Sequence, residues 1–228
     1  STDAMAIKQW PLAERPRERL LSLGPKYLTD AELVAILLHT GSVGLSAVDL
    51  ARQLLIYFGS LPDLLAASPA DFCRLYGVGS SKYVQLQAAK ELGLRLQKVQ
   101  LKKSIDLETS NKVGTYLQCE MGHYGREVFC VLLLDNQHRL LESVELFKGT
   151  IDSANVYPRE VVKLALAKNA AAVILAHNHP SGVAEPSASD KLITQALVDA
   201  LALVDIRVLD HFVVARHEWV SFADRGWM

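Results

Sequence analysis

Cysteine is scarce in this sequence of 228 residues, which contains only Cys73, Cys119 and Cys130. No two of them stand in a Cys-x-x-Cys arrangement, which excludes the zinc deaminase signature. An odd number of cysteines without regular spacing favours a reducing compartment over a disulfide framework. We therefore expect all three to act as small apolar side chains inside the fold.

Long apolar runs and a dominant charge are also missing. No apolar run approaches the roughly 18 residues that a membrane-spanning helix needs, and the start of the chain lacks the charged and then apolar pattern of a secretory signal. The net charge of -1 gives no general attraction to nucleic acids or acidic membranes. These absences predict a cytoplasmic protein with no membrane partner. Residues 1–4 are typical of a scar left by tag removal, with Met5 as the natural start.

Two hydrolase classes lack their sequence motif. The pair His217-Glu218 has no second histidine four residues after the first, which excludes the His-Glu-x-x-His metalloproteases. No Gly-x-Ser-x-Gly elbow is present to support a serine hydrolase.

The residues that are present predict two domains, with 50% hydrophobic residues available for their cores. Residues 5–103 predict an all-helical domain. Within it, Thr29 and Glu32 have the spacing of a capping box, and Gly41 is expected to close the helix that this box opens. The charged stretch near Lys98 to Lys103 and the residues from Ser104 to Ser110 predict a linker.

The second domain is predicted over residues 106–228. Apolar segments at 128–134 and 140–147 flank the polar stretch Asp135-Asn-Gln-His138, which predicts a β-hairpin. Further short apolar segments alternate with helical patterns, among them a strand over 171–177 and a helix over 190–203. We therefore predict an α+β fold, with a mixed sheet covered by helices.

One turn of the helical domain carries a weak signal for nucleic acid. The segment from Leu75 to Lys82 resembles the turn of a helix-hairpin-helix motif, in which Gly77 and Gly79 permit a tight turn and backbone amides hold a phosphate. Lys82 would add a charge contact to that phosphate. Residues 1–100 contain eleven Lys and Arg against nine Asp and Glu, which predicts weak DNA contact at best. The alternative is a helix-helix turn packed for structure alone.

The most informative stretch contains His177, His179, Ser187 and Asp190. An apolar strand precedes the two histidines, and because they are two residues apart, they point to the same face where this strand ends. Asp190 would lie in the first turn of the next helix, facing back toward them. Two imidazoles and one carboxylate suit zinc, with a fourth position left for water. The alternative is that Ser187 and Asp190 only form a capping box for the helix.

The spacing His-x-His-Pro, six residues, Ser, two residues, Asp resembles that of JAMM/MPN (Mov34) metalloprotease-like domains. The longer string from His177 to Gly182, together with Tyr157-Pro-Arg-Glu160 and Leu209-Asp-His-Phe-Val213, resembles the bacterial RadC family in particular. The resemblance covers about residues 106–228 and implies an MPN-type, cytidine-deaminase-like fold. The N-terminal half resembles the helical domain that precedes this fold in RadC-like proteins.

The resemblance also implies roles for single residues. His177, His179 and Asp190 match ligands of one Zn2+ per chain, Ser187 matches a serine that helps to stabilise an oxyanion, and Glu127 is the best match to the general base. The characterised branches of the family cleave amide or isopeptide bonds, so a peptide or protein substrate is implied. From the residues alone, Glu127 is a carboxylate at the edge of a central strand. Its rivals are Glu142, Glu145, Glu160 and Asp210, and a solvated strand-end glutamate is the alternative.

Two functional hypotheses follow. The first is a zinc hydrolase of amide or isopeptide bonds. The second is a binding module, in which the helical half contacts DNA and the MPN fold is a catalytically silent scaffold. Two further residues have open roles: His211 either supports a metal ligand or is a packed histidine, with packing favoured, and Asn178 can hold the metal loop through its amide. The sequence identifies neither the substrate nor the oligomeric state.

Overall fold

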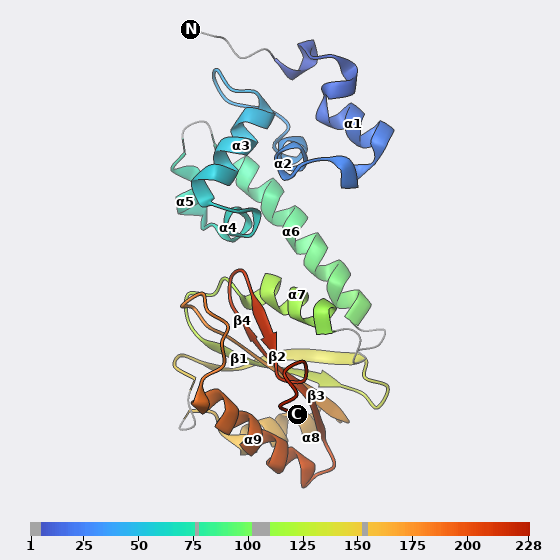
Figure 1. The fold of residues 1–228 in the computed structure, drawn as a ribbon, viewed down its shortest axis with the longest axis vertical. Helices are drawn as coiled ribbons and strands as arrows, with labels where there is room; N and C mark the ends of the chain where they lie inside the picture. Colours follow the sequence, from blue (N-terminus) through green and yellow to red (C-terminus); the bar gives the residue numbers. More distant parts are fainter. Residues whose placement is uncertain (1–5, 76–77, 102–109, 152–154) are drawn as a thin grey trace. The chain divides into compact units, whose positions relative to one another are not determined.

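The computed structural model describes residues 6–75, 78–101, 110–151 and 155–228 of the chain (Figure 1). The chain divides into two compact units, residues 1–93 and 94–228. The boundary between the units falls within a long helix, and Leu94 packs against the core of the second unit. The predicted scar at residues 1–4, Gly77, and residues 102–109 of the predicted linker lie outside the described residues.

The first unit is helical in its described part, as predicted. Its core is formed by apolar side chains such as Leu38, Leu54 and Phe72, which are at most 1% exposed. The helices are η1 (Ile7–Gln9), η2 (Leu12–Glu14), α1 (Pro16–Leu23), η3 (Pro25–Tyr27), α2 (Asp30–Leu38), α3 (Ala47–Phe58), α4 (Leu61–Ala66), α5 (Pro69–Cys73) and α6 (Ser80–Leu101).

The capping box that opens α2 is present. The Thr29 hydroxyl accepts the N–H of Glu32, and the Glu32 carboxylate accepts the N–H of Thr29. The predicted end of this helix at Gly41 is wrong, since α2 ends at Leu38 and His39 follows with a φ of 63°. Gly41 has a different role, because a Cβ at this position would lie 1.9 Å from the carbonyl oxygen of Leu45. The glycine therefore permits a close approach of two backbone segments.

The second unit is a five-stranded mixed sheet with helices on both faces, as predicted. The strands lie in the order β2-β1-β3-β4-β5; β3 and β4 are parallel and the other neighbours are antiparallel. The hairpin of β1 and β2 agrees with the sequence prediction. The elements are α7 (Ser110–Met121), β1 (Val128–Leu134), β2 (Leu140–Lys148), α8 (Pro158–Ala167), β3 (Ala172–Asn178), α9 (Ala188–Ala202), β4 (Arg207–Val214) and β5 (Trp219–Ser221).

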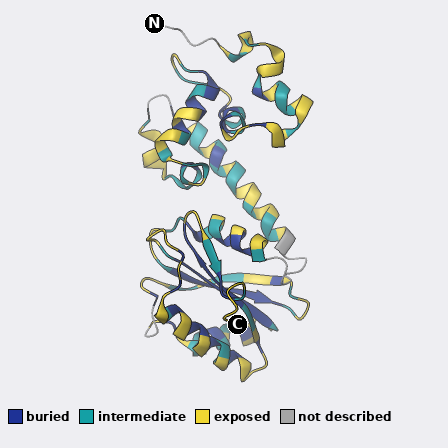
Figure 2. Cartoon of the chain, in the orientation of Figure 1, coloured by how far each residue is buried: buried dark blue, intermediate teal, exposed yellow. Residues whose placement is uncertain are grey.

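The two faces of the sheet have separate cores. On one face α7 packs over side chains such as Leu132 and Phe212, and on the other face α8 and α9 pack over Val131 and Leu175. Every residue of β1 and β3 is buried, whereas β2 at the sheet edge is largely accessible, and Figure 2 shows this contrast. The continuous apolar runs in the sequence of β1 and β3 are thus explained by their central positions.

Three smaller points complete the fold. Cys130 is buried as expected, but Cys73 and Cys119 are exposed, so the expectation for these two cysteines is wrong. The short edge strand β5 has no counterpart among the predicted elements. Among the described helices, none combines the length and the apolar character needed to cross a membrane.

The packing of α7 on the sheet gives a test of the fold. A Cβ at Gly114 would lie 2.4 Å from ring atoms of Trp219, whose ring packs against Phe212. We expect Gly114→Ala to lower the free energy of unfolding of the second unit by about 1–3 kcal/mol, because the crowded indole must shift. Chemical denaturation measures this change, and Gly125→Ala is the control because open space surrounds Gly125. Equal stability of the two variants would contradict the packing.

Candidate metal centre

Strand β3 carries the two histidines of the predicted site. His177 lies opposite Phe129 of β1 and Val213 of β4, so it is held in the middle of the sheet, and its side chain is 1% exposed. His179 follows immediately after the strand, and its backbone N–H donates to the carbonyl of Val214. The chain then turns through Gly182, which has a φ of 91°. The predicted placement of both histidines at the end of a buried strand is confirmed.

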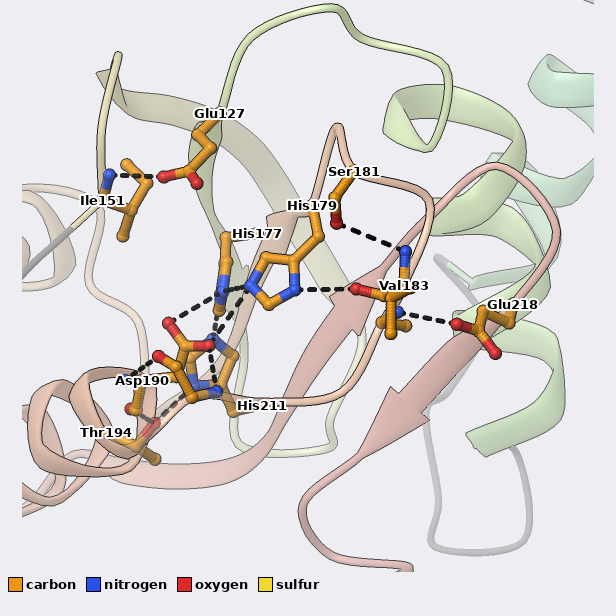
Figure 3. Close-up of polar contacts among 12 residues, drawn as sticks. Glu127, Ile151, His177, His179, Ser181, Val183, Asp190, Thr194, His211 and Glu218 are labelled. Carbon is orange, nitrogen blue, oxygen red and sulfur yellow. Dashed lines mark hydrogen bonds and ion pairs between the residues drawn. The ribbon is translucent and has the colours of Figure 1, made fainter.

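Helix α9 supplies the carboxylate. Ser187 is the N-cap residue: its hydroxyl accepts the N–H of Asp190 at 3.0 Å, and Asp190 Oδ2 accepts the N–H of Ser187 at 2.7 Å. The capping box considered as an alternative is therefore present. It does not compete with metal binding, because the same reciprocal bonds turn the Asp190 carboxylate toward the histidines (Figure 3).

The three side chains converge closely. The Nε2 atoms of His177 and His179 are 3.1 Å apart. Asp190 Oδ1 lies 3.1 Å from His177 Nε2, and Asp190 Oδ2 lies 3.2 Å from His179 Nε2. Within the described part of the chain, this is a group of side chains that can hold a metal ion, and two of its members are buried.

Hydrogen-bond directions fix the tautomer of His177. The Thr194 hydroxyl donates its single hydrogen to the Asp190 carbonyl oxygen, so it can only accept from His211 Nδ1. Full burial lowers the pKa of His211 well below its usual value, which keeps this imidazole neutral with its proton on Nδ1. His211 Nε2 must then accept from His177 Nδ1 at 2.8 Å. The lone pair of His177 therefore lies on Nε2 and faces Asp190.

His179 is oriented by a carbonyl group. Its Nδ1 lies 3.0 Å from the carbonyl oxygen of Val183, which can only accept, so Nδ1 carries the proton and Nε2 the lone pair. Two imidazole lone pairs and a carboxylate thus face one another at about hydrogen-bond distance. Only a cation between them, either a proton or a metal ion, removes the repulsion.

The pKa shifts agree with this requirement. The hydrogen bond with Asp190 raises the pKa of His179 above its usual value, against the opposing effect of burial. Burial by itself would raise the pKa of Asp190, but a proton held between this carboxylate and His177 or His179 outweighs burial and keeps that pKa far below its usual value. The carboxylate is therefore ionised. Two neutral imidazoles and one carboxylate are a donor set that fits a divalent transition metal ion.

Glu127 immediately precedes β1, and Figure 3 shows its carboxylate turned toward the backbone nitrogen of Ile151. Its Oε2 accepts the backbone N–H of Ile151, and its charge contributes to the raised pKa of His179. The four rival carboxylates have other partners. Glu142 pairs with Lys168, Glu145 with Lys148, Glu160 with Lys163, and Asp210 is buried against Ser221.

Asn178 connects the histidines to Glu127. It lies between His177 and His179 in the sequence, points to the opposite face of β3, and is fully buried. Its Oδ1 accepts the N–H of Val128 at 2.7 Å, and its Nδ2 donates to the carbonyl of Arg126 at 2.9 Å. The amide therefore holds the two neighbours of Glu127. The predicted role of Asn178 in holding the metal loop is replaced by this contact with the start of β1.

Residues near the C-terminus also pack against the site, a contact that the sequence did not predict. The ring of Phe222 stacks on His211 with centroids 4.7 Å apart, and Trp227 packs edge-on against Phe222. The Lys191 ammonium lies 4.0 Å from the centroid of the Trp227 ring. Thus His211 is both a packed histidine and a partner of His177.

Lys82 lies in the other unit and does not have the predicted role. Its ammonium donates to the carbonyls of Leu38 and Thr40 at 3.0 and 2.7 Å and to the Thr40 hydroxyl at 2.9 Å. These three bonds use all three N–H groups of the lysine. A phosphate contact is thus no longer assigned to Lys82. Gly79 has open space around its Cα, and Gly77 lies outside the described residues.

Thr194 allows a test of the hydrogen-bond chain. In Thr194→Val the shape is kept, but His211 Nδ1 loses its acceptor and His177 loses its fixed tautomer. We expect the affinity for Zn2+ to fall about 10- to 100-fold, measured by competition with a chelating dye. Thr115→Val, on the exposed face of α7, is the control and should bind Zn2+ like the wild type. An unchanged affinity in a folded Thr194 variant would refute the assigned proton positions.

Comparisons with known proteins agree with the family that the sequence resembles. The family model described as RadC-like JAB domain matches residues 107–227, and the model described as UPF0758 N-terminal matches residues 7–84. A UPF0758 protein of Cellvibrio japonicus is 59% identical over 98% of this chain and 100% of its own length. UPF0758 proteins of Aeromonas salmonicida and Aeromonas hydrophila are each 58% identical over the same shares. The chain therefore belongs to the UPF0758 family, with a RadC-like JAB domain that carries the His177, His179 and Asp190 cluster.

Proposed function

We propose that this protein is a zinc-dependent hydrolase of amide or isopeptide bonds. The observation that carries the proposal is the convergence of two imidazole lone pairs and an ionised carboxylate, which leaves a cation as the missing partner. The three donor pairs are 3.1 to 3.2 Å apart. Adjacent ligands in a tetrahedral zinc site with bonds of about 2.0–2.1 Å are about 3.3 Å apart, so the observed spacing suits zinc.

His177, His179 and Asp190 would hold the ion, and His211 and Thr194 would hold His177 in place. Bound zinc supplies a Lewis acid that polarises a carbonyl oxygen and makes hydroxide available near neutral pH. Three protein ligands in place of four leave room for a substrate, which is typical of catalytic and not of structural zinc sites.

Glu127 is proposed as the general base. Its Oε2 is occupied by the N–H of Ile151, but its Oε1 has no hydrogen-bond partner among the described residues. This oxygen can take a proton from the attacking water and deliver it to the nitrogen of the leaving amine. The N–H of Ile151 and the amide of Asn178, which holds the backbone on both sides of Glu127, restrict the carboxylate to one position.

Ser187 is proposed to stabilise the oxyanion. Its oxygen accepts the N–H of Asp190, whereas its own hydrogen has no acceptor within the described part of the chain, and the residue is exposed. The hydroxyl can therefore donate to a substrate oxygen that gains negative charge during the attack.

Metal analysis tests the binding site directly. After reconstitution and removal of free metal, we expect about one equivalent of zinc per wild-type chain and less than half an equivalent in His177→Ala, because two side chains cannot keep the ion. His217→Ala, which alters an exposed histidine outside the cluster, is the control. Equal zinc contents in all three proteins would contradict the proposal.

A substrate panel tests the chemistry. We expect the zinc-loaded protein to cleave members of a panel of peptides and lysine-branched isopeptides, and Glu127→Gln to lower the cleavage rate about 10²- to 10⁴-fold while keeping its zinc. Glu142→Gln removes a carboxylate from the exposed edge strand and should leave the rate unchanged. The absence of zinc-dependent cleavage across the whole panel would favour the second hypothesis, a binding module with a silent scaffold.

A further inference from the structure

The first unit contains a cavity of about 240 Å³ with a basic lining. Lys8, Arg15, Arg17 and His39 line it together with a single carboxylate, that of Glu18. The rest of its described lining is apolar and belongs to η1, α1, α2 and α3. The concentration of cationic groups is notable because residues 1–100 as a whole are nearly balanced in charge.

The cations around this cavity are available to a ligand. Within the described part of the chain, neither Lys8 nor Arg17 forms an ion pair, and both side chains are exposed. Arg15 uses its Nε to donate to the carbonyl of Trp10 at 2.8 Å, which fixes the guanidinium and leaves its terminal nitrogens free to donate. Helix α1 begins here at Pro16 without a side chain that caps its first N–H groups, so its positive end adds to the potential of the cavity.

His39 is held at the cavity by an unusual backbone conformation. Its φ of 63° and ψ of -49° are those of a γ-turn of the rarer, strained kind, and the N–H of Thr40 donates to the carbonyl of Leu38 at 2.7 Å across this turn. Lys82 donates to the carbonyls of Leu38 and Thr40 on both sides of His39. The lysine thus stabilises a strained residue that lines the cavity, and strain of this kind is concentrated where ligands bind.

We propose that this cavity binds a phosphate monoester. Three cationic side chains against one carboxylate match the charge of a terminal phosphate, which is about -1.5 to -2 at pH 7. Arginine is suited to phosphate because its planar fork donates two parallel hydrogen bonds. The cavity is smaller than the roughly 300 Å³ at which pockets begin to enclose a whole small molecule, so it accepts the phosphate and leaves the rest of the ligand outside. The phosphate can belong to a free nucleotide or to the 5′ end of a nucleic acid.

Two binding measurements on the full chain test the proposal. Calorimetry measures the affinity for inorganic phosphate, adenosine 5′-monophosphate and succinate. Fluorescence anisotropy measures the affinity for a labelled single-stranded oligonucleotide with and without a 5′-phosphate. In Lys8→Gln/Arg17→Gln we expect the affinity for the phosphate probes to fall at least about tenfold. The control Lys26→Gln/Arg52→Gln removes the same charge from exposed positions of the same unit outside the cavity and should bind like the wild type.

The outcomes separate the sources of the phosphate. Tighter binding of the 5′-phosphorylated than of the hydroxyl-ended oligonucleotide, lost in the cavity variant, supports the proposal with a nucleic-acid end as ligand. Binding of adenosine 5′-monophosphate but of neither oligonucleotide supports it with a free nucleotide. Absence of saturable binding in the wild type, equal affinity for succinate, or equal losses in the two double variants would overturn it.

Discussion

The candidate site depends on one electrostatic constraint: two imidazole lone pairs and a carboxylate are held within 3.2 Å of one another. The fold maintains this contact by holding the imidazole protons of His177 and His179 on their Nδ1 atoms, away from the cluster. The Thr194 hydroxyl accepts the proton on His211 Nδ1, and His211 in turn accepts the proton on His177 Nδ1. The carbonyl of Val183 accepts the proton on His179 Nδ1. Because of these bonds, the neutral imidazoles of His177 and His179 have no N–H that could be donated to each other or to Asp190. The site is thus prepared for a positive charge before one arrives.

The sheet and the helix cap hold the three side chains of the cluster in place. The two-residue period of β3 places both histidines on one face, and a capping box turns Asp190 toward them. Aromatic rings then fill the space behind the ligands, with Phe129 stacked parallel to His177 and Phe222 on His211. Burial lowers the pKa of His211 and keeps it neutral, so the same packing that stabilises the core also fixes the ligand tautomer.

Local patterns predicted the elements and the convergence of His177, His179 and Asp190, because each rests on neighbours in the sequence. The apolar runs of β1 and β3, the Thr29 capping box and the His-x-His spacing each lie within a few consecutive residues. Features that join distant segments were missed. The bond of His177 to His211 spans 34 residues, and that of Lys82 to Leu38 spans 44. No local pattern shows that a lysine beside a glycine-rich turn will donate inward to a helix end, and this is why Lys82 was misassigned.

Asn178 separates His177 from His179 in the sequence, and its position on the far side of β3 has a mechanical consequence. One short stretch of backbone carries both metal donors on one side and the support of the glutamate on the other. A slide of this strand by one residue would exchange the sides, so the histidine cluster and the support of the Glu127 backbone would be lost together. The position of the two histidines relative to Glu127 is therefore set by the pleat of a single strand.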